Sequence, residues 1–242
     1  MARITGNLKN DNPLINNSNV EDFFKHRANK IKELDYLRAV MYQDNNPQLV
    51  LDRNRAEKEK LLPLIPLNKE SKILDVGCGT GRWLDHLDKN FKNYHGVDLS
   101  IGFIEYAKSR FTQDNISFSV GKAQDLDEEK KYNILLCMGV IIYLNDEDVI
   151  QFFKKANNLM ESNSSTLIIR EPIALMERLT LVDEYSQDLD QYYNAIYRTK
   201  DELIDLFNKY LPSFEVLKLE KLFEGSLNNR IETQQYYFIL RN

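Results

Sequence analysis

Residues Lys72 to Gly81 read Lys-Ile-Leu-Asp-Val-Gly-Cys-Gly-Thr-Gly. The apolar first half predicts a buried strand, and the second half alternates glycine with small residues. A mixed polar and apolar pattern over residues 80–90 predicts a helix directly after it. In α/β proteins a strand, a glycine turn and a helix together hold nucleotide-like ligands, because glycines adopt positive φ and let the ligand approach the backbone. We therefore expect the rest of the chain to be organised around this loop.

Beyond this loop, strand and helix patterns alternate along the chain. Strands are predicted at 72–76, 94–98, 116–120, 132–138, 165–170, 214–219 and 236–240. Helices are predicted at about 20–31, 48–61, 80–90, 100–111, 146–161 and 199–210. The short connection between the last two strands favours an antiparallel pair, whereas the alternation before it predicts parallel strands with helices on both faces. The fold class is therefore α/β, with a seven-stranded, mostly parallel sheet and an antiparallel last strand.

Two regions depart from this alternation. Residues 1–68 begin with a polar, asparagine-rich arm to about residue 18 and continue with helices. We predict that they form an N-terminal arm and helical cap beside a main domain of residues 69–242. Residues 173–198 follow a strand that is expected to stop at Pro172, and they are rich in acids and tyrosines. We predict that this second region is an insertion that forms a lid over the site.

The chain of 242 residues is 43% hydrophobic and carries a formal net charge of −5. Its length fits one α/β domain with additions, and its acidic balance gives no overall attraction to nucleic acid. Cys78 and Cys137 cannot form a disulfide framework, so a reduced, cytoplasmic compartment is expected. The chain has no apolar run of the roughly 18–20 residues that a membrane span requires, and its start lacks the apolar core of a signal peptide. We expect a monomer or homodimer.

Three ligand classes fit a glycine loop of this kind: a dinucleotide, a phosphate group and S-adenosylmethionine. The dinucleotide fingerprint spaces its glycines as Gly-x-Gly-x-x-Gly, and the segment Thr80–Arg82 breaks that spacing. A phosphate loop requires Gly-Lys followed by Ser or Thr, which this chain lacks. Asp98 lies about 20 residues after the loop at a strand end, where a carboxylate can accept both hydroxyls of a ribose. The alternatives are a tight turn without a ligand and an Asp98 that caps the next helix.

Two motifs resemble those of the class I S-adenosylmethionine-dependent methyltransferases. Asp75–Gly81 is similar to the family's first motif almost letter for letter, and Gly96–Ser100, which reads Gly-Val-Asp-Leu-Ser, is similar to the second. The resemblance covers about residues 70–170. It implies a Rossmann-like methyltransferase fold with S-adenosylmethionine as the cofactor. In that fold the glycine loop packs on the methionine part of the cofactor and Asp98 holds the ribose.

The family's third motif, Gly-Asp-Ala-Glu, reads Gly-Lys-Ala-Gln-Asp over residues 121–125. Lys122 therefore replaces the acid that faces the adenine amino group, and we expect it to be a solvated lysine. The hydrogen-bond acceptor is then Gln124, Asp125 or the backbone at Ala123. By the same resemblance, the end of the following strand lies below the sulfonium. The predicted cofactor-binding residues are Asp75, Gly77, Cys78, Gly79, Gly81, Trp83, Asp98, Leu99, Ala123, Gln124, Asp125, Met138 and Gly139.

The segment after that strand lacks two patterns of the family: the Asn/Asp-Pro-Pro-Tyr/Phe of many nucleic-acid-base methyltransferases and the paired glutamates of protein arginine methyltransferases. A small molecule or a glycan is therefore the expected methyl acceptor, and nucleic acid is not. Arg170 and Glu171 end a strand at the edge of the sheet where ligands bind. Tyrosines, which offer a stacking face and a hydroxyl, follow in the insertion. The predicted acceptor-binding residues are Arg27, Tyr143, Arg170, Tyr193, Tyr197 and Arg198.

A hydroxyl acceptor benefits from a base that takes its proton. Glu171, His26 and Tyr42 are the candidates for this catalytic role. The alternatives are an ion pair between Arg170 and Glu171 that ties down the insertion, tyrosines on a helix that packs on the sheet, and a His26 on the surface of its helix. Clusters of Asp and Glu occur only in charged helices and loops, so we predict no metal ion.

The leading hypothesis is a methyltransferase that moves a methyl group to oxygen or nitrogen of a small polar acceptor. The N-terminal cap and the tyrosine-rich insertion resemble those of bacterial methyltransferases that modify surface-polysaccharide sugars or their nucleotide-linked precursors. The alternatives are methylation of an amine metabolite or natural product, a nucleotide-binding oxidoreductase and a non-catalytic binding module. The glycine spacing and the antiparallel last strand argue against the oxidoreductase, and the intact first two motifs argue against the binding module.

Overall fold

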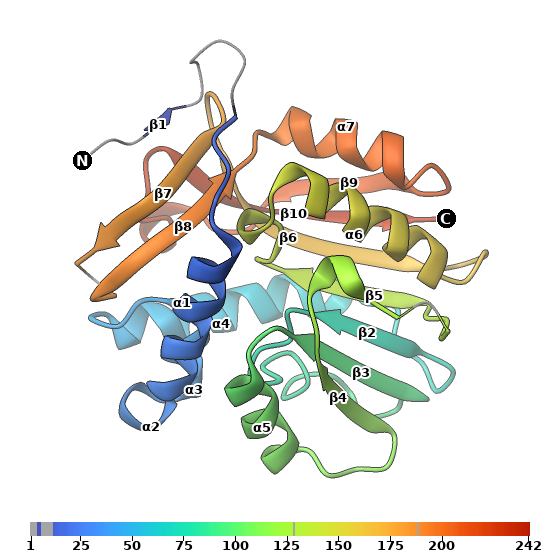
Figure 1. Cartoon of the computed structure of the whole chain (residues 1–242). Helices are drawn as coiled ribbons and strands as arrows, with labels where there is room; N and C mark the ends of the chain where they lie inside the picture. Colours follow the sequence, from blue (N-terminus) through green and yellow to red (C-terminus); the bar gives the residue numbers. More distant parts are fainter. Residues whose placement is uncertain (1–3, 6–11, 128, 188) are drawn as a thin grey trace.

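The computed structural model describes residues 4–5, 12–127, 129–187 and 189–242. Its centre is a seven-stranded sheet with the order β4-β3-β2-β5-β6-β10-β9 (Figure 1). Neighbouring strands from β4 to β6 pair in parallel, and β10 runs antiparallel to both β6 and β9. The mostly parallel sheet with an antiparallel last strand is therefore confirmed. Its strands are β2 (Lys72–Val76), β3 (Asn93–Asp98), β4 (Ile116–Val120), β5 (Ile134–Met138), β6 (Thr166–Ala174), β9 (Glu215–Lys221) and β10 (Thr233–Arg241).

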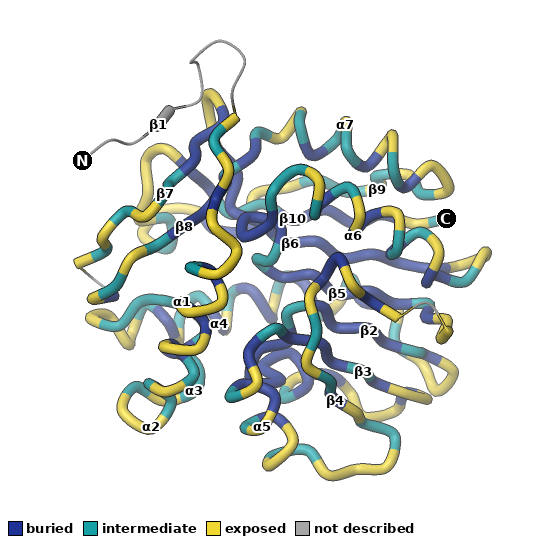
Figure 2. Tube along the Cα trace, viewed as in Figure 1, coloured by how far each residue is buried: buried dark blue, intermediate teal, exposed yellow. Residues whose placement is uncertain are grey.

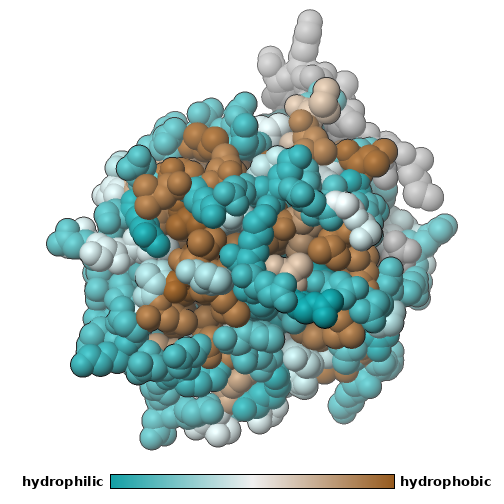
Figure 3. Space-filling view, turned by 180° about the vertical axis from the view of Figure 1, so that it is seen from behind, coloured by the Kyte–Doolittle hydropathy of each residue, from teal (hydrophilic) through white to brown (hydrophobic). Residues whose placement is uncertain are grey.

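Helices cover both faces of this sheet, and its central strands β2, β5 and β6 are buried, whereas the edge strands β4 and β9 are largely exposed or half-buried (Figure 2). On one face α6 and α7 pack through Phe153 and Phe207, and Phe207 also contacts Phe238 of β10. On the other face, residues of α4, α5 and the segment after β2 form a second apolar cluster. Viewed from behind, apolar side chains gather in patches that polar side chains surround (Figure 3). The α-helices are α1 (Asn17–Asn29), α2 (Ile31–Leu34), α3 (Tyr36–Met41), α4 (Pro47–Leu61), α5 (Ile101–Arg110), α6 (Asp146–Leu159) and α7 (Lys200–Tyr210).

Short 3₁₀ turns connect several of these elements: η1 (Leu62–Leu64), η2 (Ala123–Asp125), η3 (Ile141–Tyr143) and η4 (Gly225–Leu227). In the part of the chain that the structure describes, no helix combines the length and the apolar character that crossing a membrane needs. The two cysteines are free and buried.

The expected insertion is an antiparallel hairpin. Its strands are β7 (Leu179–Ser186) and β8 (Gln191–Tyr197), and β7 also pairs with the two-residue strand β1 (Ile4–Thr5) in a separate sheet. The alternative in which the insertion tyrosines lie on a helix is therefore wrong. Much of the predicted polar arm, at residues 1–3 and 6–11, lies outside the described residues.

Two local predictions are wrong. No helix forms over residues 80–90, because Gly81 adopts a φ of +75° and Arg82 and Trp83 turn their side chains toward α4, so consecutive turns follow the loop. The strand predicted to stop at Pro172 continues to Ala174. From Glu171 to Ile173 it pairs with β10 on one side only, so the amide hydrogen that Pro172 lacks is not needed on the other side.

Arg27 ties the N-terminal helices together from inside. Its side chain is 0% exposed and donates hydrogen bonds to the carbonyl oxygens of Ala39 (3.0 Å) and Arg38 (2.6 Å). It also holds the Asp44 carboxylate through two bonds of 2.6 and 2.7 Å. A buried guanidinium that satisfies three acceptors in this way holds α1, α3 and the turn after α3 in one arrangement.

Replacing Arg27 with alanine is expected to lower the free energy of unfolding by about 3–5 kcal/mol, because it leaves the nearly buried Asp44 carboxylate with only the longer 4.0 Å contact to Lys30. Urea denaturation of the purified variant measures this loss. His26 is the matched control, since it is exposed on the same helix, and His26→Ala should change stability by no more than about 0.5 kcal/mol. Equal midpoints for the two variants would contradict the role given to Arg27.

Candidate active site

A cavity of about 600 Å³ lies at the carboxyl ends of β2, β3, β5 and β6. Residues at these strand ends line it, among them Gly77, Asp98, Gly139 and Arg170. Residues of α1, α3, α4 and the β7–β8 hairpin also line it. Its size suits a nucleotide-like cofactor together with a small second ligand. Ligands of open α/β sheets bind at this edge, so this cavity is the candidate active site.

The glycine loop is held to the neighbouring strand by its own backbone. The amides of Gly77 and Cys78 donate to the carbonyl oxygen of Val97, at 2.7 and 3.1 Å. Gly77 has a φ of +69°, and a Cβ at this position would lie 2.3 Å from Val140 Cγ2. A larger residue would therefore be strained and would collide with the segment after β5. The loop can lie this close to that segment only as glycine.

Asp98, at the end of β3, joins the loop to the next helix. Its carboxylate accepts one hydrogen bond from the amide of Gly79 (2.9 Å) and one from the amide of Ser100 (2.8 Å), the residue that precedes α5. The side chain lines the cavity, and each carboxylate oxygen retains a further lone pair. Burial raises the pKa of Asp98 to about 6, and the two backbone donors oppose that rise. The carboxylate therefore supports the loop and the helix start and still faces the cavity.

The third motif has one buried acceptor without a partner, on a residue that lines the cavity. Gln124 is buried, and its Oε1 has no hydrogen-bond partner within the described ranges. Ala123 also lines the cavity, whereas Asp125 is exposed and is not part of the lining. Lys122 is partly exposed and pairs with Glu21 of α1 at 2.7 Å. An unpartnered amide oxygen at this place fits an amino group such as that of adenine.

The remaining predicted cofactor residues divide into two groups. Asp75 lies beneath the loop, outside the cavity lining, where it accepts a 2.6 Å hydrogen bond from the Tyr94 hydroxyl and burial raises its pKa to about 6. Gly81 closes the turn by donating to the carbonyl oxygen of Cys78 and is not part of the lining either. Their placement gives Asp75 and Gly81 a part in shaping the loop. The members that do line the cavity are Cys78, Trp83, Leu99, Met138 and Gly139.

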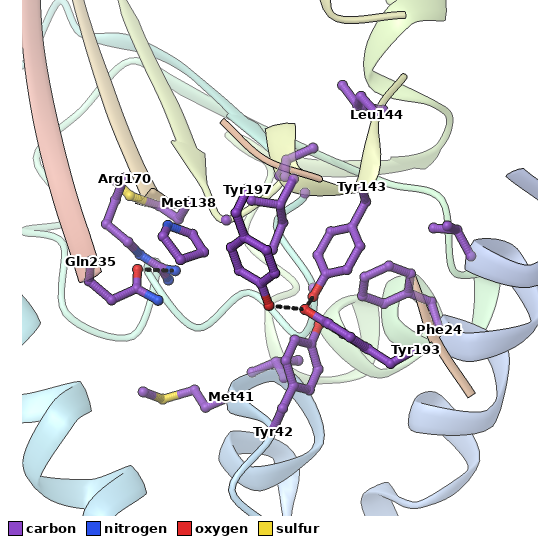
Figure 4. Close-up of a pocket in the computed structure, with 18 of the residues that line it drawn as sticks. Phe24, Met41, Tyr42, Met138, Tyr143, Leu144, Arg170, Tyr193, Tyr197 and Gln235 are labelled. Atoms are coloured by element: carbon purple, nitrogen blue, oxygen red, sulfur yellow. Dashed lines mark hydrogen bonds between the residues drawn. The ribbon is translucent and has the colours of Figure 1, made fainter. Parts of the chain in front are cut away.

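At the other end of the cavity, tyrosine hydroxyls point toward one another (Figure 4). The hydroxyls of Tyr143 and Tyr193 are 3.0 Å apart, and Tyr197 donates to Tyr193 over 3.4 Å. Tyr42 and Phe24 complete the aromatic wall from the N-terminal helices. Burial raises the pKa of Tyr193 to about 12 and also raises the pKa of Tyr42, Tyr143 and Tyr197. These phenols are therefore neutral near pH 7 and can both donate and accept hydrogen bonds.

Arg170 extends from β6 into the cavity and lies directly over Gly139. A Cβ on Gly139 would be 2.8 Å from Arg170 Nη1. Arg170 Nε donates to Glu57 over 2.8 Å, and Nη1 donates to Gln235 over 3.4 Å. Glu57 of α4 is 1% exposed and also pairs with Arg82. Although burial opposes ionisation, Arg170 and Arg82 lower the pKa of Glu57 to about 2, so the carboxylate stays charged between them.

Glu171 points away from the cavity. It is buried and accepts hydrogen bonds from the amides of Val140 (2.8 Å), Ile141 (2.9 Å) and Ile142 (3.4 Å). Burial raises its pKa to about 7, and the three amides and Arg170 oppose that rise. Glu171 thus positions η3, the turn that carries Tyr143. Its placement does not support the predicted role as a base, and the predicted Arg170–Glu171 ion pair is replaced by Arg170–Glu57.

Three other predicted residues do not reach the cavity. Arg27 is occupied inside the N-terminal helices, and His26 is exposed on α1. Arg198 is buried and bonds to Asp146 and to the carbonyl oxygens of Ile141 and Leu144. All three are absent from the cavity lining. Arg27 and Arg198 hold elements of the fold together instead, and His26 faces solvent. Among the predicted bases, Tyr42 alone lines the cavity.

Several cavity residues carry no sequence signal. Glu57, Arg82, Gln235 and Arg230 all line the cavity. Glu57 lies within a helix rich in charges, and Gln235 within a strand next to Tyr236, so neither differs locally from a surface residue. Within the described ranges, no group of three or more His, Cys, Asp and Glu side chains is arranged to hold a metal ion.

Dinucleotide-binding sheets of the Rossmann type are built from parallel βαβ halves. Here β10 runs antiparallel between β6 and β9, and the glycine loop and Asp98 face one cavity at the carboxyl ends of the strands. These features place the chain in the class of Rossmann-like methyltransferase folds. In agreement, residues 73–163 match the family model described as a methyltransferase domain. Over residues 73–163, the segment that carries the glycine loop and Asp98, the chain is therefore similar to methyltransferase domains.

Curated and solved proteins show the same likeness. A malonyl-[acyl-carrier protein] O-methyltransferase of Priestia megaterium is 36% identical over 80 residues, which is 32% of this chain and 29% of the relative. Another, from Ilyobacter polytropus, is 24% identical over 80% of this chain and 76% of its own length. The chain spans 29–42% of the length of the Priestia protein, of a malonyl-[acyl-carrier protein] O-methyltransferase of Acetivibrio thermocellus and of a ubiquinone biosynthesis O-methyltransferase of Pelagibacter ubique. Haemonchus contortus phosphoethanolamine N-methyltransferase 1, solved with phosphoethanolamine and S-adenosylhomocysteine, has a TM-score of 0.70 at 19% identity over 94% of this chain and 50% of that one.

Asp98→Asn is expected to weaken binding of S-adenosylhomocysteine at least about 100-fold, because hydrogen bonds to a charged group contribute about 1.5–3 kcal/mol each and two ribose hydroxyls lose that charge. Isothermal titration calorimetry measures the affinity. Asp125→Asn is the control, since Asp125 is exposed beside the cavity and should leave the affinity unchanged. An Asp98→Asn protein with wild-type affinity would refute the ribose contact.

Glu171 is expected to make the cofactor-free protein less stable as the pH rises. Its folded pKa of about 7 lies above the ordinary value of 4.5, so its stabilising contribution is complete below about pH 4.5 and is lost as the pH rises through 7. Relative to Glu171→Gln, the wild type should lose up to about 1.4 kcal/mol per pH unit between pH 5 and 7. Urea midpoints from pH 5 to 8 test this, with the exposed Glu147→Gln as the control that should parallel the wild type. If the stability of Glu171→Gln and of the wild type changed with pH in parallel, the raised pKa of Glu171 would be contradicted.

Proposed function

We propose that this protein is an S-adenosylmethionine-dependent methyltransferase that moves a methyl group to oxygen or nitrogen of a small polar acceptor. The observation that carries the proposal is the continuity of the cavity. The glycine loop and Asp98 line one end, and the tyrosine hydroxyls and Arg170 line the other, with Gly139 between the two. A cofactor and an acceptor can therefore meet in one continuous cavity.

The cofactor end offers a fitting partner for each part of the donor. We propose that Asp98 accepts the ribose hydroxyls and that the Gln124 side chain accepts from the adenine amino group. The glycine loop leaves room for the methionine portion against its backbone. When bound, the cofactor supplies a methyl group that its sulfonium already activates. The protein therefore contributes chiefly by holding the nucleophile in line with that methyl group.

The acceptor end is suited to orienting a polar molecule. Tyr143, Tyr193 and Tyr197 present neutral hydroxyls, which can hold a hydroxyl or amine of the acceptor by donating or accepting hydrogen bonds. Sugars, with many hydroxyls and flat apolar faces, fit such a wall of tyrosines, so a sugar or sugar nucleotide is one candidate acceptor. Tyr42, whose pKa is raised by burial, stays protonated and orients rather than removes a proton.

We also propose that residues 1–68 and the β7–β8 hairpin act as a cap and a lid for the acceptor. Phe24 and Tyr42 come from the former, and Tyr193 and Tyr197 from the latter. Phe23 of α1 contacts Tyr193 edge to face, with ring centroids 5.4 Å apart. These two segments therefore pack on each other over the cavity and exclude water from the acceptor end.

Calorimetric titration of the purified protein with S-adenosylhomocysteine and, separately, with NAD tests the class of activity. S-adenosylhomocysteine should bind with a micromolar or lower Kd, and NAD should not bind. Release of S-adenosylhomocysteine from S-adenosylmethionine, measured over a panel of sugar nucleotides and amines, then identifies acceptors. Binding of NAD in place of the homocysteine compound would overturn the proposal.

A further inference from the structure

Three arginines from three separate segments line the acceptor end of the cavity. Arg53 comes from α4, Arg170 from β6, and Arg230 from the connection between β9 and β10. They lie near one another: Arg53 bonds to Asn229, the residue before Arg230, and Arg170 bonds to Glu57, which lies one turn after Arg53 on α4. Burial, together with the charges of Arg230 and Arg170, lowers the pKa of Arg53 to about 10. A cluster of like charges that repel one another is unfavourable unless an anion compensates it.

The arginines are only partly neutralised by the protein itself. Arg53 donates to the carbonyl oxygen of Leu227 at 2.8 and 2.6 Å and to Asn229 Oδ1 at 2.7 Å, all uncharged acceptors. Arg230 is exposed at the edge of the cavity. Among the residues that the structure describes, neither Arg53 nor Arg230 forms an ion pair. Arg170 has Glu57 as its partner, but Glu57 is shared with Arg82.

The other acids of the lining are Glu21, Asp98, Glu184 and Glu232. Glu21 pairs with Lys122, and Asp98 accepts backbone hydrogen bonds beside the glycine loop. Glu184 lies on the hairpin, where its charge raises the pKa of Tyr197, and Glu232 immediately precedes β10. Neither Glu21 nor Asp98 forms an ion pair with any of the three arginines in the described ranges. The positive charge at the acceptor end therefore stays available to a ligand.

Unused donors accompany this charge. Within the described chain, Arg170 Nη2 and Arg53 Nη1 make no hydrogen bond. The Arg170 guanidinium lies against Gly139, at the junction of the two ends of the cavity. A planar guanidinium matches the geometry of carboxylate and phosphate oxygens. An oxyanion held here would lie next to the place where the methyl group is transferred.

We infer that the methyl acceptor carries an oxyanion, a phosphate ester or a carboxylate, that Arg53, Arg170 and Arg230 bind together while the tyrosine hydroxyls orient the methylated end. This inference rests on the proposed function. It narrows the small polar acceptors to anionic ones. The carboxylate of the cofactor is also an oxyanion that these arginines can bind. The anions are therefore titrated into protein whose cofactor site already holds S-adenosylhomocysteine.

Isothermal titration of inorganic phosphate and of malonate into protein saturated with S-adenosylhomocysteine tests the inference, in buffers matched for chloride ionic strength. At least one anion should bind, and Arg53→Gln and Arg230→Gln should each weaken that binding about tenfold or more. Arg230 is exposed, so its variant should fold normally, which thermal unfolding checks. Arg55→Gln is the matched control, because Arg55 is on the same helix, is exposed, pairs with Asp52 and does not line the cavity.

The outcomes separate the sources of the anion. Tighter binding of phosphate supports a phosphate-ester acceptor, and tighter binding of malonate supports a carboxylate acceptor. The inference is overturned if neither anion binds, if Arg55→Gln weakens binding as much as the other variants, or if anions bind only without S-adenosylhomocysteine. In that last case the arginines hold the cofactor's carboxylate, and the proposed methyltransferase function stands. If S-adenosylhomocysteine itself does not bind, the proposed function fails and this inference fails with it.

Discussion

The buried carboxylate of Glu57 is the contact on which the site depends. It joins three segments that are distant in sequence: α4, which carries it, the turn after the glycine loop through Arg82, and the end of β6 through Arg170. Two guanidiniums keep it ionised, and losing one partner of a buried ion pair is strongly unfavourable. This contact brings Arg82 against α4, where the segment after the loop forms turns instead of a helix. It also fixes the direction of Arg170 over Gly139, between the two ends of the cavity.

The two ends of the cavity are built in different ways. The cofactor end rests on the ends of parallel strands, and its contacts are backbone hydrogen bonds among Gly77, Gly79, Val97 and Asp98. The acceptor end is assembled from α1, α3, η3, β8 and the connection before β10, which meet through aromatic rings and shared hydroxyls. Glu171 supports this second assembly from behind by accepting the amides of η3. The donor site rests on strands of the sheet, whereas the acceptor site is assembled from separate segments. The residues that bind the acceptor can therefore differ without changing the donor site.

Adjacent residues on one strand show where prediction from sequence stops. Arg170 and Glu171 are adjacent charged residues of the otherwise apolar strand β6, and both were predicted to serve the acceptor. Successive side chains of a strand point to opposite faces, so one of the two could reach the cavity and the other had to face away. Which residue faced which way depended on η3 and α4, and these are placed by tertiary packing. Arg27 and Arg198 were misassigned for the same reason, since a charge seen in sequence does not reveal whether its partner is a ligand or the backbone.

By itself, the sequence determined the seven strands of the main sheet, the antiparallel end of that sheet, the glycine loop, and Asp98 as the acid that faces the cavity. These features are local: they follow from apolar runs, glycine spacing and turn residues within short windows. Only the tertiary structure decided that residues 80–90 form turns, that the insertion is a hairpin, and that Glu57, Arg53 and Arg230 meet Arg170. Those outcomes depend on side chains brought together from distant segments, and such contacts are favourable only once the sheet and the N-terminal helices have packed and excluded water between them.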